Sequence, residues 1–466
     1  MRRWIALVGA VALICALGVQ APVAAAAGTK TVIVSPSGGN DTAGIQAAFD
    51  ACAGRPGCTV RFTAGHFFTN SVAVRHFAGF VTGAGQGKTV IDSLRGLDPS
   101  LPGVTLTQFD PGDPTTLFPV PVLLGFDGGS VSMSNLTFDI TAAEPAETWY
   151  LDYSAWTDLR VTVLVTGNTS STFDRVTFVG HAGSSWGVNN VHPICICGMR
   201  QLDEAGGDWS VIQPTRGNHA ITRSTFEGVN NAIVVQQLTD GKLTVGGNAS
   251  RGNFFDAAIA FNPSDNPNSD VEFSYNDIDT YYFGAWIEDW EAVAGGQHPA
   301  RPGRYAISHN TIHVGDWANG VVLADIGRAP GTAATFVATV ADNTIILDAA
   351  NSAGIFGYNS RNAIIRDNAI SGVGPLGIYA GTSCDPGSGC DEVTGWLILS
   401  NNVQKMTAAS APIWLGPGTS HCTVVGTNLQ TTVQDDGTGN VLIDVTRHSG
   451  PHPKLLPWPW KGAPRL

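Results

Sequence analysis

The chain has 466 residues, of which 43% are apolar and 14% charged, and its formal net charge is −13. This acidic balance argues against nucleic acid as a partner, and no phosphate loop, dinucleotide fingerprint or basic patch is present. The 56 glycines, together with plentiful Asn, Thr, Ser and Val, favour strands and turns over long helices.

Residues 1–27 have the pattern of a secretory signal peptide. Arg2 and Arg3 precede an apolar stretch that begins at Ile5, and small residues end near Ala27. The apolar stretch is short for a bilayer span, and no later segment is long and apolar enough to replace it. We therefore expect a secreted, extracellular protein without a membrane partner.

Export makes the cysteines candidates for disulfides. Cys52 and Cys58 bracket "AGRPG", and Cys384 and Cys390 bracket "DPGSG", so each pair is predicted to close a small loop. The pairing of three further cysteines stays open: Cys195, Cys197 and Cys422. No second Cys/His pair at zinc-ligand spacing accompanies the first two of these, so a metal site is not favoured.

The first predicted element is a short helix over residues 41–53. It follows an Asn/Asp cap, and Ile45, Ala48, Phe49 and Cys52 recur at helical spacing. Gly and Pro then turn the chain into "TVRF", a predicted strand.

A repeat dominates the rest of the chain. Phrases such as "NDI" and "NTI" return with Asn at 253, 276, 310, 343, 368 and 401, at steps of 23, 34, 33, 25 and 33 residues. Around each Asn lie three short strand patterns, the third beginning at Gly or Ala as in "GAWIED" and "GVVLAD". Such a period indicates one stacked solenoid, here over residues 28–445.

The repeat resembles the right-handed parallel β-helix superfamily, often called pectin-lyase-like. The resemblance covers residues 31–430 and lies in the Asn-x-Ile and Gly-Ile motifs and in the helix before "TVRFTAGHF". It implies an all-β solenoid with a capping helix and a ladder of Asn side chains, and we expect those Asn residues to tolerate αL geometry. Superfamily members include lyases, hydrolases, epimerases, fructan-transforming enzymes, tailspikes and noncatalytic surface proteins, so the resemblance does not define the reaction.

The resemblance also implies that the third strand of each repeat lines a long groove. Strand alternation with the Ile of Gly-Ile inward predicts the outward positions, which include Val234 and Ala260. Predicted substrate contacts combine ring faces and polar groups, as sugar binding requires, and are Trp286, Phe356, Tyr358, Tyr379, Gln236 and Asn262, with His181 from a loop.

Carboxylates in two neighbouring repeats are the candidate catalytic groups. "WIEDWE" supplies Glu288 and Asp289, and "LADIG" supplies Asp325 in the next coil. Neighbouring coils lie about 4.8 Å apart, which permits the carboxyl separations of both retaining and inverting glycosidases. We assign Glu288 and Asp325 as the acid/base or nucleophilic pair, with Asp289 as the substitute partner.

The leading hypothesis is an enzyme that cleaves or rearranges glycosidic bonds of a neutral polysaccharide without a cofactor. A uronan lyase or epimerase would need cationic groups or Ca²⁺ to neutralise the substrate carboxylate, and the groove strands contain no Lys or Arg. The polygalacturonase motifs Asn-Thr-Asp, Asp-Asp and Gly-His-Gly are absent in register. A noncatalytic glycan-binding solenoid is the third hypothesis, and the sugar and the oligomeric state stay open.

Two segments depart from the repeat. Residues 144–217 carry Trp, Tyr and His in irregular sequence and predict a long insertion beside the groove. Residues 446–466 are Pro-rich and predict a tail packed on the solenoid.

Overall fold

The structure is a computed structural model, and it describes residues 30–93, 104–110, 113–139, 148–149, 160–180, 187–188, 191–197, 215–229, 231–236, 238–253, 256–260, 269–280, 283–288, 303–316, 318–324, 326–327, 337–381, 393–404, 411–426 and 431–447. Within these ranges, only the backbone is described for 104–121, 148–149, 160, 187–188, 191, 236, 253, 256–260 and 288.

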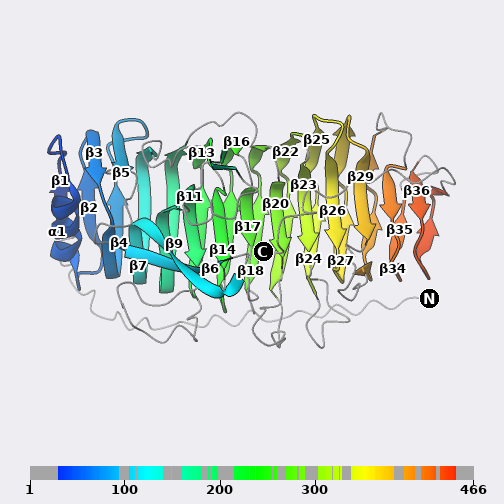
Figure 1. Ribbon diagram of the computed structural model, residues 1–466, viewed down its shortest axis with the longest axis horizontal. Helices are drawn as coiled ribbons and strands as arrows, with labels where there is room; N and C mark the ends of the chain where they lie inside the picture. Colours follow the sequence, from blue (N-terminus) through cyan, green and yellow to red (C-terminus); the bar gives the residue numbers. More distant parts are fainter. Residues whose placement is uncertain are drawn as a thin grey trace, which may run out of the picture.

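The described chain winds into a right-handed parallel β-helix with three walls, which confirms the predicted fold (Figure 1). The first wall contains the strands that precede the Asn turn: β1 (Thr31–Val34), β2 (Cys58–Phe62), β12 (Asn218–Thr222), β15 (Lys242–Gly246), β18 (Asp270–Ser274), β21 (Arg304–Ser308), β24 (Ala338–Ala341), β27 (Ala363–Arg366), β31 (Leu397–Leu399), β35 (Thr423–Val425) and β37 (Val441–Ile443).

The second wall follows that turn and contains β3 (Gly65–Thr69), β5 (Thr89–Ser93), β13 (Thr225–Glu227), β16 (Ala249–Asn253), β19 (Asp277–Thr280), β22 (Thr311–Val314), β25 (Thr344–Leu347), β28 (Ala369–Gly372) and β32 (Asn402–Val403). The third wall contains β11 (Val191–Cys197), β14 (Ile233–Gln236), β17 (Asp256–Ala260), β20 (Phe283–Glu288), β23 (Asn319–Ala324), β26 (Ala353–Tyr358), β29 (Leu376–Gly381), β33 (Ile413–Leu415), β36 (Thr432–Asp435) and β38 (Thr446–Arg447).

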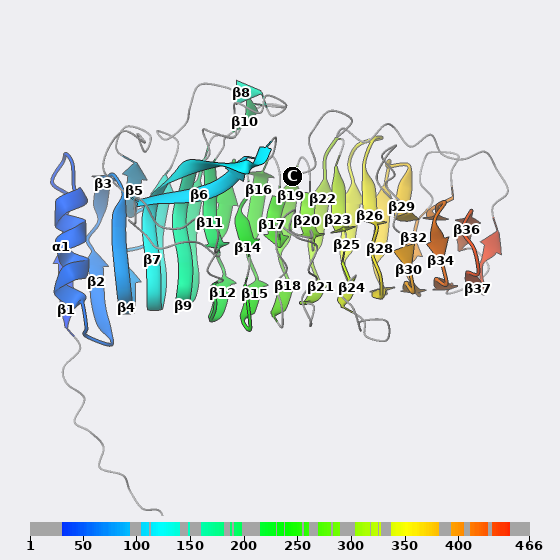
Figure 2. The same ribbon diagram turned by 60° about the horizontal axis from the view of Figure 1, so that its bottom comes forward.

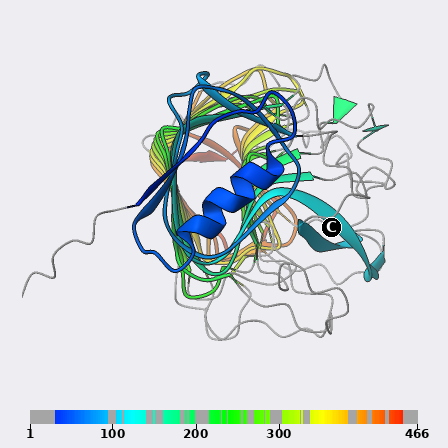
Figure 3. The ribbon, with the colours of Figure 1, turned by 90° about the vertical axis from the view of Figure 1, so that its left-hand side faces the viewer.

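Three long strands pass through corners and serve more than one wall: β4 (Val72–Thr82), β7 (Asp113–Asp139) and β9 (Arg160–Val179). The start of β7 pairs antiparallel with β6 (Val104–Asp110), and this hairpin lies outside the coil (Figures 2 and 3). Small pairs complete the described strands: β8 (Thr148–Trp149) with β10 (Gly187–Val188), and β30 (Val393–Thr394) with β34 (Thr419–Ser420).

The helix α1 (Thr42–Cys52) lies across the N-terminal end of the coil (Figure 3). Asn40 Oδ1 accepts a hydrogen bond from the Thr42 backbone N–H at 3.0 Å, close to the predicted capping position. The apolar residues of the helix, among them Ile45 and Phe49, are buried against the first coils. A disulfide joins Cys52 at the helix end to Cys58 at the start of β2.

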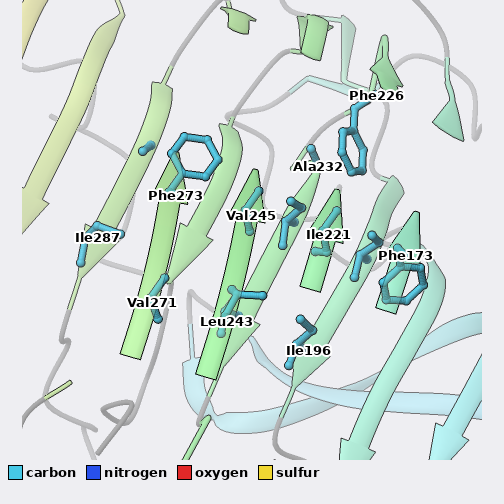
Figure 4. Close-up of a cluster of buried hydrophobic side chains, with 14 of the residues drawn as sticks. Phe173, Ile196, Ile221, Phe226, Ala232, Leu243, Val245, Val271, Phe273 and Ile287 are labelled. Atoms are coloured by element: carbon cyan, nitrogen blue, oxygen red, sulfur yellow. The ribbon is translucent and has the colours of Figure 1, made fainter. Parts of the chain in front are cut away.

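The coil interior is one continuous apolar core, formed by alternate residues of every wall. Figure 4 shows part of it, where Phe173, Ile221, Val245 and Phe273 follow one another along the first wall. In the second wall, Phe138, Phe178 and Phe226 stack with ring centroids 5.2 and 5.3 Å apart. Burial of these rows supplies the main stabilising free energy of the fold.

A ladder of buried Asn side chains occupies the turn between the first and second walls. Asn310 is typical, because its Nδ2 donates to Asn343 Oδ1 at 2.9 Å and to the Phe273 carbonyl at 2.9 Å. The ladder residues are Asn248, Asn276, Asn310, Asn343, Asn368 and Asn401. Each rung thereby satisfies backbone groups that the turn leaves without a strand partner.

Two details of the predicted ladder were wrong. The αL conformation belongs to the residue before each Asn, for example Tyr275 at φ 58° and His309 at φ 57°. In the coil before that of Asn276, the ladder residue is Asn248 rather than the predicted Asn253. Asn253 lies at the end of β16, after a bulge in the pairing of β16 with β19.

Two predicted boundaries also differ from the structure. Residues 144–217 are not one insertion, because they contain β9 and β11, which pair with β7 and β14 in the walls. The strand β9 runs through its corners without a loop, and Gly167 at φ 62° and Arg175 at φ 55° occupy the turns. At the other end, Thr446 and Arg447 pair with β36 and belong to the solenoid rather than to the tail.

Candidate functional site

The outer face of the third wall is the candidate site, and its register fixes which residues share a row. Trp286 pairs with Val322, which pairs with Phe356, then Tyr379 and Trp414. These side chains form an apolar cluster separate from the interior core, which includes the intervening Ile287 and Leu323. The structure therefore has Trp286, Phe356 and Tyr379 on the outer face, as the alternation predicted.

The rings in this row are packed rather than open. Trp286 is 3%, Phe356 9% and Tyr379 3% exposed, so the expectation that they line a solvent-exposed groove was wrong. Ring centroids lie 4.7 Å apart for Phe356 and Tyr379 and 5.1 Å apart for Tyr379 and Trp414. Contact between neighbouring rings removes part of their apolar area from water. Tyr358 is half-buried and is the predicted ring contact that keeps an open surface.

At the C-terminal end of the row, the Asp436 carboxylate accepts two side-chain hydrogen bonds. Trp414 Nε1 donates to Asp436 Oδ2 at 2.6 Å, and Gln434 Nε2 donates to the same oxygen at 3.0 Å. Burial, together with the nearby Asp436 carboxylate, raises the pKa of Tyr379 to about 12. The Tyr379 phenol therefore stays protonated at neutral pH and is not a general base.

The three predicted catalytic carboxylates lie at or beyond the ends of β20 and β23. Glu288 is the last residue of β20 and pairs with Ala324, which pairs with Tyr358. Glu288 is two residues after Trp286 in β20, so strand alternation gives both residues outward positions, which we call the outward parity. The Glu288 side chain, Asp289 and Asp325 lie outside the described residues, and Asp325 directly follows Ala324 in the sequence.

The remaining predicted contacts are only partly described. Gln236 ends β14 and pairs with Cys197, but its side chain is outside the described residues, as are Asn262 and His181. Cys384 and Cys390 also lie outside them. The outward position in β17 was wrong by one residue, because Ile259 pairs with Trp286 while Ala260 pairs with the inward Ile287.

The structure adds polar groups that the sequence interpretation missed. Beyond Tyr358, the turn into the first wall contains Asn359 Oδ1, Ser360 Oγ and Arg361 Nε, all buried without a hydrogen-bond partner among the described residues. Arg361 is also free of any ion pair within that part of the chain. Its position two residues past the groove segment "GIFGYN" was the available signal in the sequence.

A second polar group lies in the coil interior at the start of β11. His192 Nε2 lies 3.3 Å from Asn231 Nδ2, and burial lowers the pKa of His192 to about 3. Cys195 and Cys197, three and five residues further along the strand, share the outer-face row and side of Val234 rather than the interior, and they form a buried disulfide. Cys422 is a buried free cysteine, and burial raises the pKa of its thiol to about 11. These groups are shielded from solvent and are better suited to structure than to catalysis.

The described residues contain no cluster of three His, Cys, Asp or Glu side chains able to hold a metal ion. No helix among them has the length and apolar character needed to cross a bilayer.

No protein-family model matches the chain, and no curated protein matches it in sequence. Solved structures with similar architecture include the A-module of a mannuronan C-5 epimerase from Azotobacter vinelandii, with 14% identity, TM-score 0.45 and coverage of 89% of this chain and 96% of that one. A periplasmic alginate epimerase shares 12% identity at TM-score 0.49, covering 82% of this chain and 77% of its own. A family 28 exopolygalacturonase from Yersinia enterocolitica shares 11% at TM-score 0.48, covering 85% and 78%.

The class that the walls, the capping helix and the ladder define is the right-handed parallel β-helix. Identities this low do not carry an activity from those structures to this chain.

Proposed function

We propose that this protein is a secreted carbohydrate-active enzyme that cleaves or rearranges glycosidic bonds of a neutral polysaccharide on the third wall. Glu288 and Asp325 are the proposed paired carboxylates, and Asp289 is the substitute partner. The observation that supports the proposal is the register of β20, β23 and β26, which gives Glu288 the outward parity two strands from the half-buried Tyr358.

The proposed chemistry divides two roles between the carboxyl groups. One, held protonated by apolar surroundings, donates its proton to the departing glycosidic oxygen. The other stays ionised and either attacks the anomeric carbon or activates the incoming water or hydroxyl group. Tyr358 supplies a ring against which the C–H face of a sugar packs. Ala324, which pairs with both Glu288 and Tyr358, has a short side chain and is itself buried.

The test compares substitution of the two proposed catalytic carboxylates with substitution of a carboxylate on another wall. Glu288→Gln and Asp325→Asn are assayed on neutral and acidic polysaccharides, with reducing ends and the ultraviolet absorbance of unsaturated uronides as readouts. We expect each variant to lose about a hundredfold or more in rate. Glu272→Gln is the control, because Glu272 lies in β18 of the same coil as Glu288 but on the first wall, where its Oε1 accepts a hydrogen bond from Ser274 Oγ at 3.2 Å. Full activity in both Glu288→Gln and Asp325→Asn would refute the site.

Arg361 favours a second candidate function, a uronan lyase or epimerase. Its guanidinium lies just past β26, and its buried Nε has no partner among the described residues. A guanidinium pairs well with the carboxylate of a uronide, which this chemistry must neutralise. New ultraviolet absorbance on acidic polymers, lost in Arg361→Gln, would support this candidate. Binding without turnover on every polymer would instead support a noncatalytic solenoid.

A further inference from the structure

A hollow of about 270 Å³ lies on the outer face of the first wall, near its N-terminal end. It extends over β4, β7 and β9 and over the turn that precedes β2. Its lining includes Pro56, Phe80, Ser130, Ser132, Ser170 and Thr172. Glu288 belongs to the third wall, so the hollow is separate from the candidate catalytic site.

The register explains the shape of the hollow. Phe80 pairs with Thr59 on one side and with Ser132 on the other, and Ser132 pairs with Thr172, so a large ring lies in a row of short hydroxyl side chains. In the parallel row, Ser130 pairs with Ser170. The Phe80 ring therefore borders a floor formed by the Ser and Thr residues.

The exposure of Phe80 also indicates a binding surface. Its side chain is 49% exposed, although Phe77 in the same strand is 3% exposed. Exposing a large aromatic ring on the outer face of a sheet forgoes the free energy of burying it. A ligand that covers the ring on binding would recover part of that free energy.

The chemistry of the lining points to one kind of ligand. No lining residue carries a charge, so the hollow has no group that would neutralise a uronate, a phosphate or a sulfate. An aromatic ring beside several hydroxyls suits a pyranose, which presents a C–H face to the ring and hydroxyls to the Ser and Thr side chains. We propose that this hollow binds one or more units of a neutral polysaccharide chain, as a noncatalytic site on the first wall.

The row of Phe80 also gives the bound chain a direction. Beyond Thr172 the row continues to Ala220 and Thr244, which are both half-buried and short. Successive strands advance by about 4.8 Å along the solenoid. That advance is close to the length of one sugar unit in an extended glycan, so successive units meet short side chains as far as Thr244, after which Glu272 is the next residue of the row. The polymer would lie along the solenoid axis.

The same features disfavour a second copy of this chain as the occupant. A specific protein interface buries roughly 800 Å² on each partner and has an apolar centre. Phe80 is the one large exposed apolar side chain of the hollow, and the residues around it are hydroxyl-bearing or small. The inference goes beyond the proposed function, because binding here would hold the protein on its polymer whatever the third wall does.

The test measures binding to insoluble cellulose, xylan, chitin, mannan and β-1,3-glucan, with pectin and alginate as acidic comparators. We expect the full chain to bind at least one neutral polymer and Phe80→Ala to bind it about tenfold more weakly, equal to about 1.4 kcal/mol. Ser132→Glu, which places a charge on the floor, should weaken binding similarly. Val441→Ala is the matched control, because Val441 is 50% exposed on the same wall at the far end.

Several results would overturn the inference. These are no binding to any neutral polymer, unchanged binding by both hollow variants, or an equal loss in Val441→Ala. A change in oligomeric state on Phe80→Ala, measured by light scattering, would assign the hollow to a second copy instead. Failure of this proposal and failure of the proposed function are distinguishable, because Phe80→Ala should leave turnover of short soluble oligosaccharides unchanged while Glu288→Gln should abolish it and keep polymer binding.

Discussion

Two buried histidines should make the free energy of unfolding fall as the pH is lowered from 7 to 5. Burial lowers the pKa of His219 to about 4 and that of His192 to about 3, from an ordinary value of 6.5. His219 is 2% exposed, and its Nδ1 lies 2.9 Å from Ser171 Oγ. The folded state therefore keeps both rings neutral at a pH where the unfolded chain protonates them.

The sign and size follow from proton linkage. Both pKa values are lower in the folded state, so this stability is complete above pH 6.5 and is lost as the pH falls toward the folded values. The pH of 5 lies about 1.5 units below the ordinary histidine pKa, and each unit is worth about 1.4 kcal/mol. Each histidine then costs about 2 kcal/mol at pH 5, or roughly 4 kcal/mol for the pair.

The measurement is guanidinium-induced unfolding at pH 7 and pH 5. His219→Asn keeps a polar atom near Nδ1 for Ser171 and removes the titration, so its loss of stability between the two pH values should be about 2 kcal/mol smaller than that of the unsubstituted protein. His309→Asn is the control, because His309 is exposed at φ 57°, a conformation that Asn tolerates. An equal pH dependence in His219→Asn and the unsubstituted protein would refute the reasoning.

Three further predictions concern the scaffold and are read out by the same unfolding assay. Asn310→Ala should lower the free energy of unfolding by about 2 to 4 kcal/mol, since it leaves buried groups of neighbouring coils without partners; a loss below 1 kcal/mol would show that the ladder is not a main source of stability. Gly320→Ala should lower the free energy of unfolding by about 1 to 3 kcal/mol, because the new Cβ would lie 2.7 Å from a backbone oxygen and from an Ile methyl group. Gly44→Ala in α1 places its Cβ within 4 Å of nothing and should raise the free energy of unfolding by roughly 0.5 to 1 kcal/mol. Equal effects of the two substitutions would contradict the close packing of the third wall. Replacing both Cys52 and Cys58 by Ser should cost about 2 kcal/mol, the value for so short a loop, and reductant should then have a smaller effect on this variant than on the unsubstituted protein.

The fold could be predicted because the same Asn-x-Ile motif recurs in many coils. Asn276, Asn310, Asn343 and Asn368 each precede an inward Ile at a fixed spacing, so one misread coil does not change the architecture. The coil of Asn248, whose ladder residue was predicted wrongly, shows where the motif is lost. At the position where the other coils have an inward Ile, the coil of Asn248 has the small buried Ser250, so the Asn-x-Ile motif is lost there. Asn253 has a similar motif but does not belong to the ladder.

The candidate site was less predictable, because its residues depend on more than strand alternation. Alternation gave the outer row correctly from β20 onward but not in β17. It says nothing about what packs on that row, and so the burial of Trp286 and Tyr379 could not be foreseen. Arg361 was missed because it belongs to a corner, where the period of two no longer applies. The hollow beside Phe80 arises from side-chain sizes on three strands that are far apart in sequence.

The Asn ladder also bears on the length of the molecule. Asn310 and Asn343 make the same three kinds of hydrogen bond, one to a carbonyl of the preceding coil and two to the following rung. Removing residues 310–342 would therefore bring Asn276 onto Asn343 without changing the kind of partner that either rung has. Whole coils can be lost or duplicated as units, so the length of the solenoid can change by one coil at a time while the fold is kept.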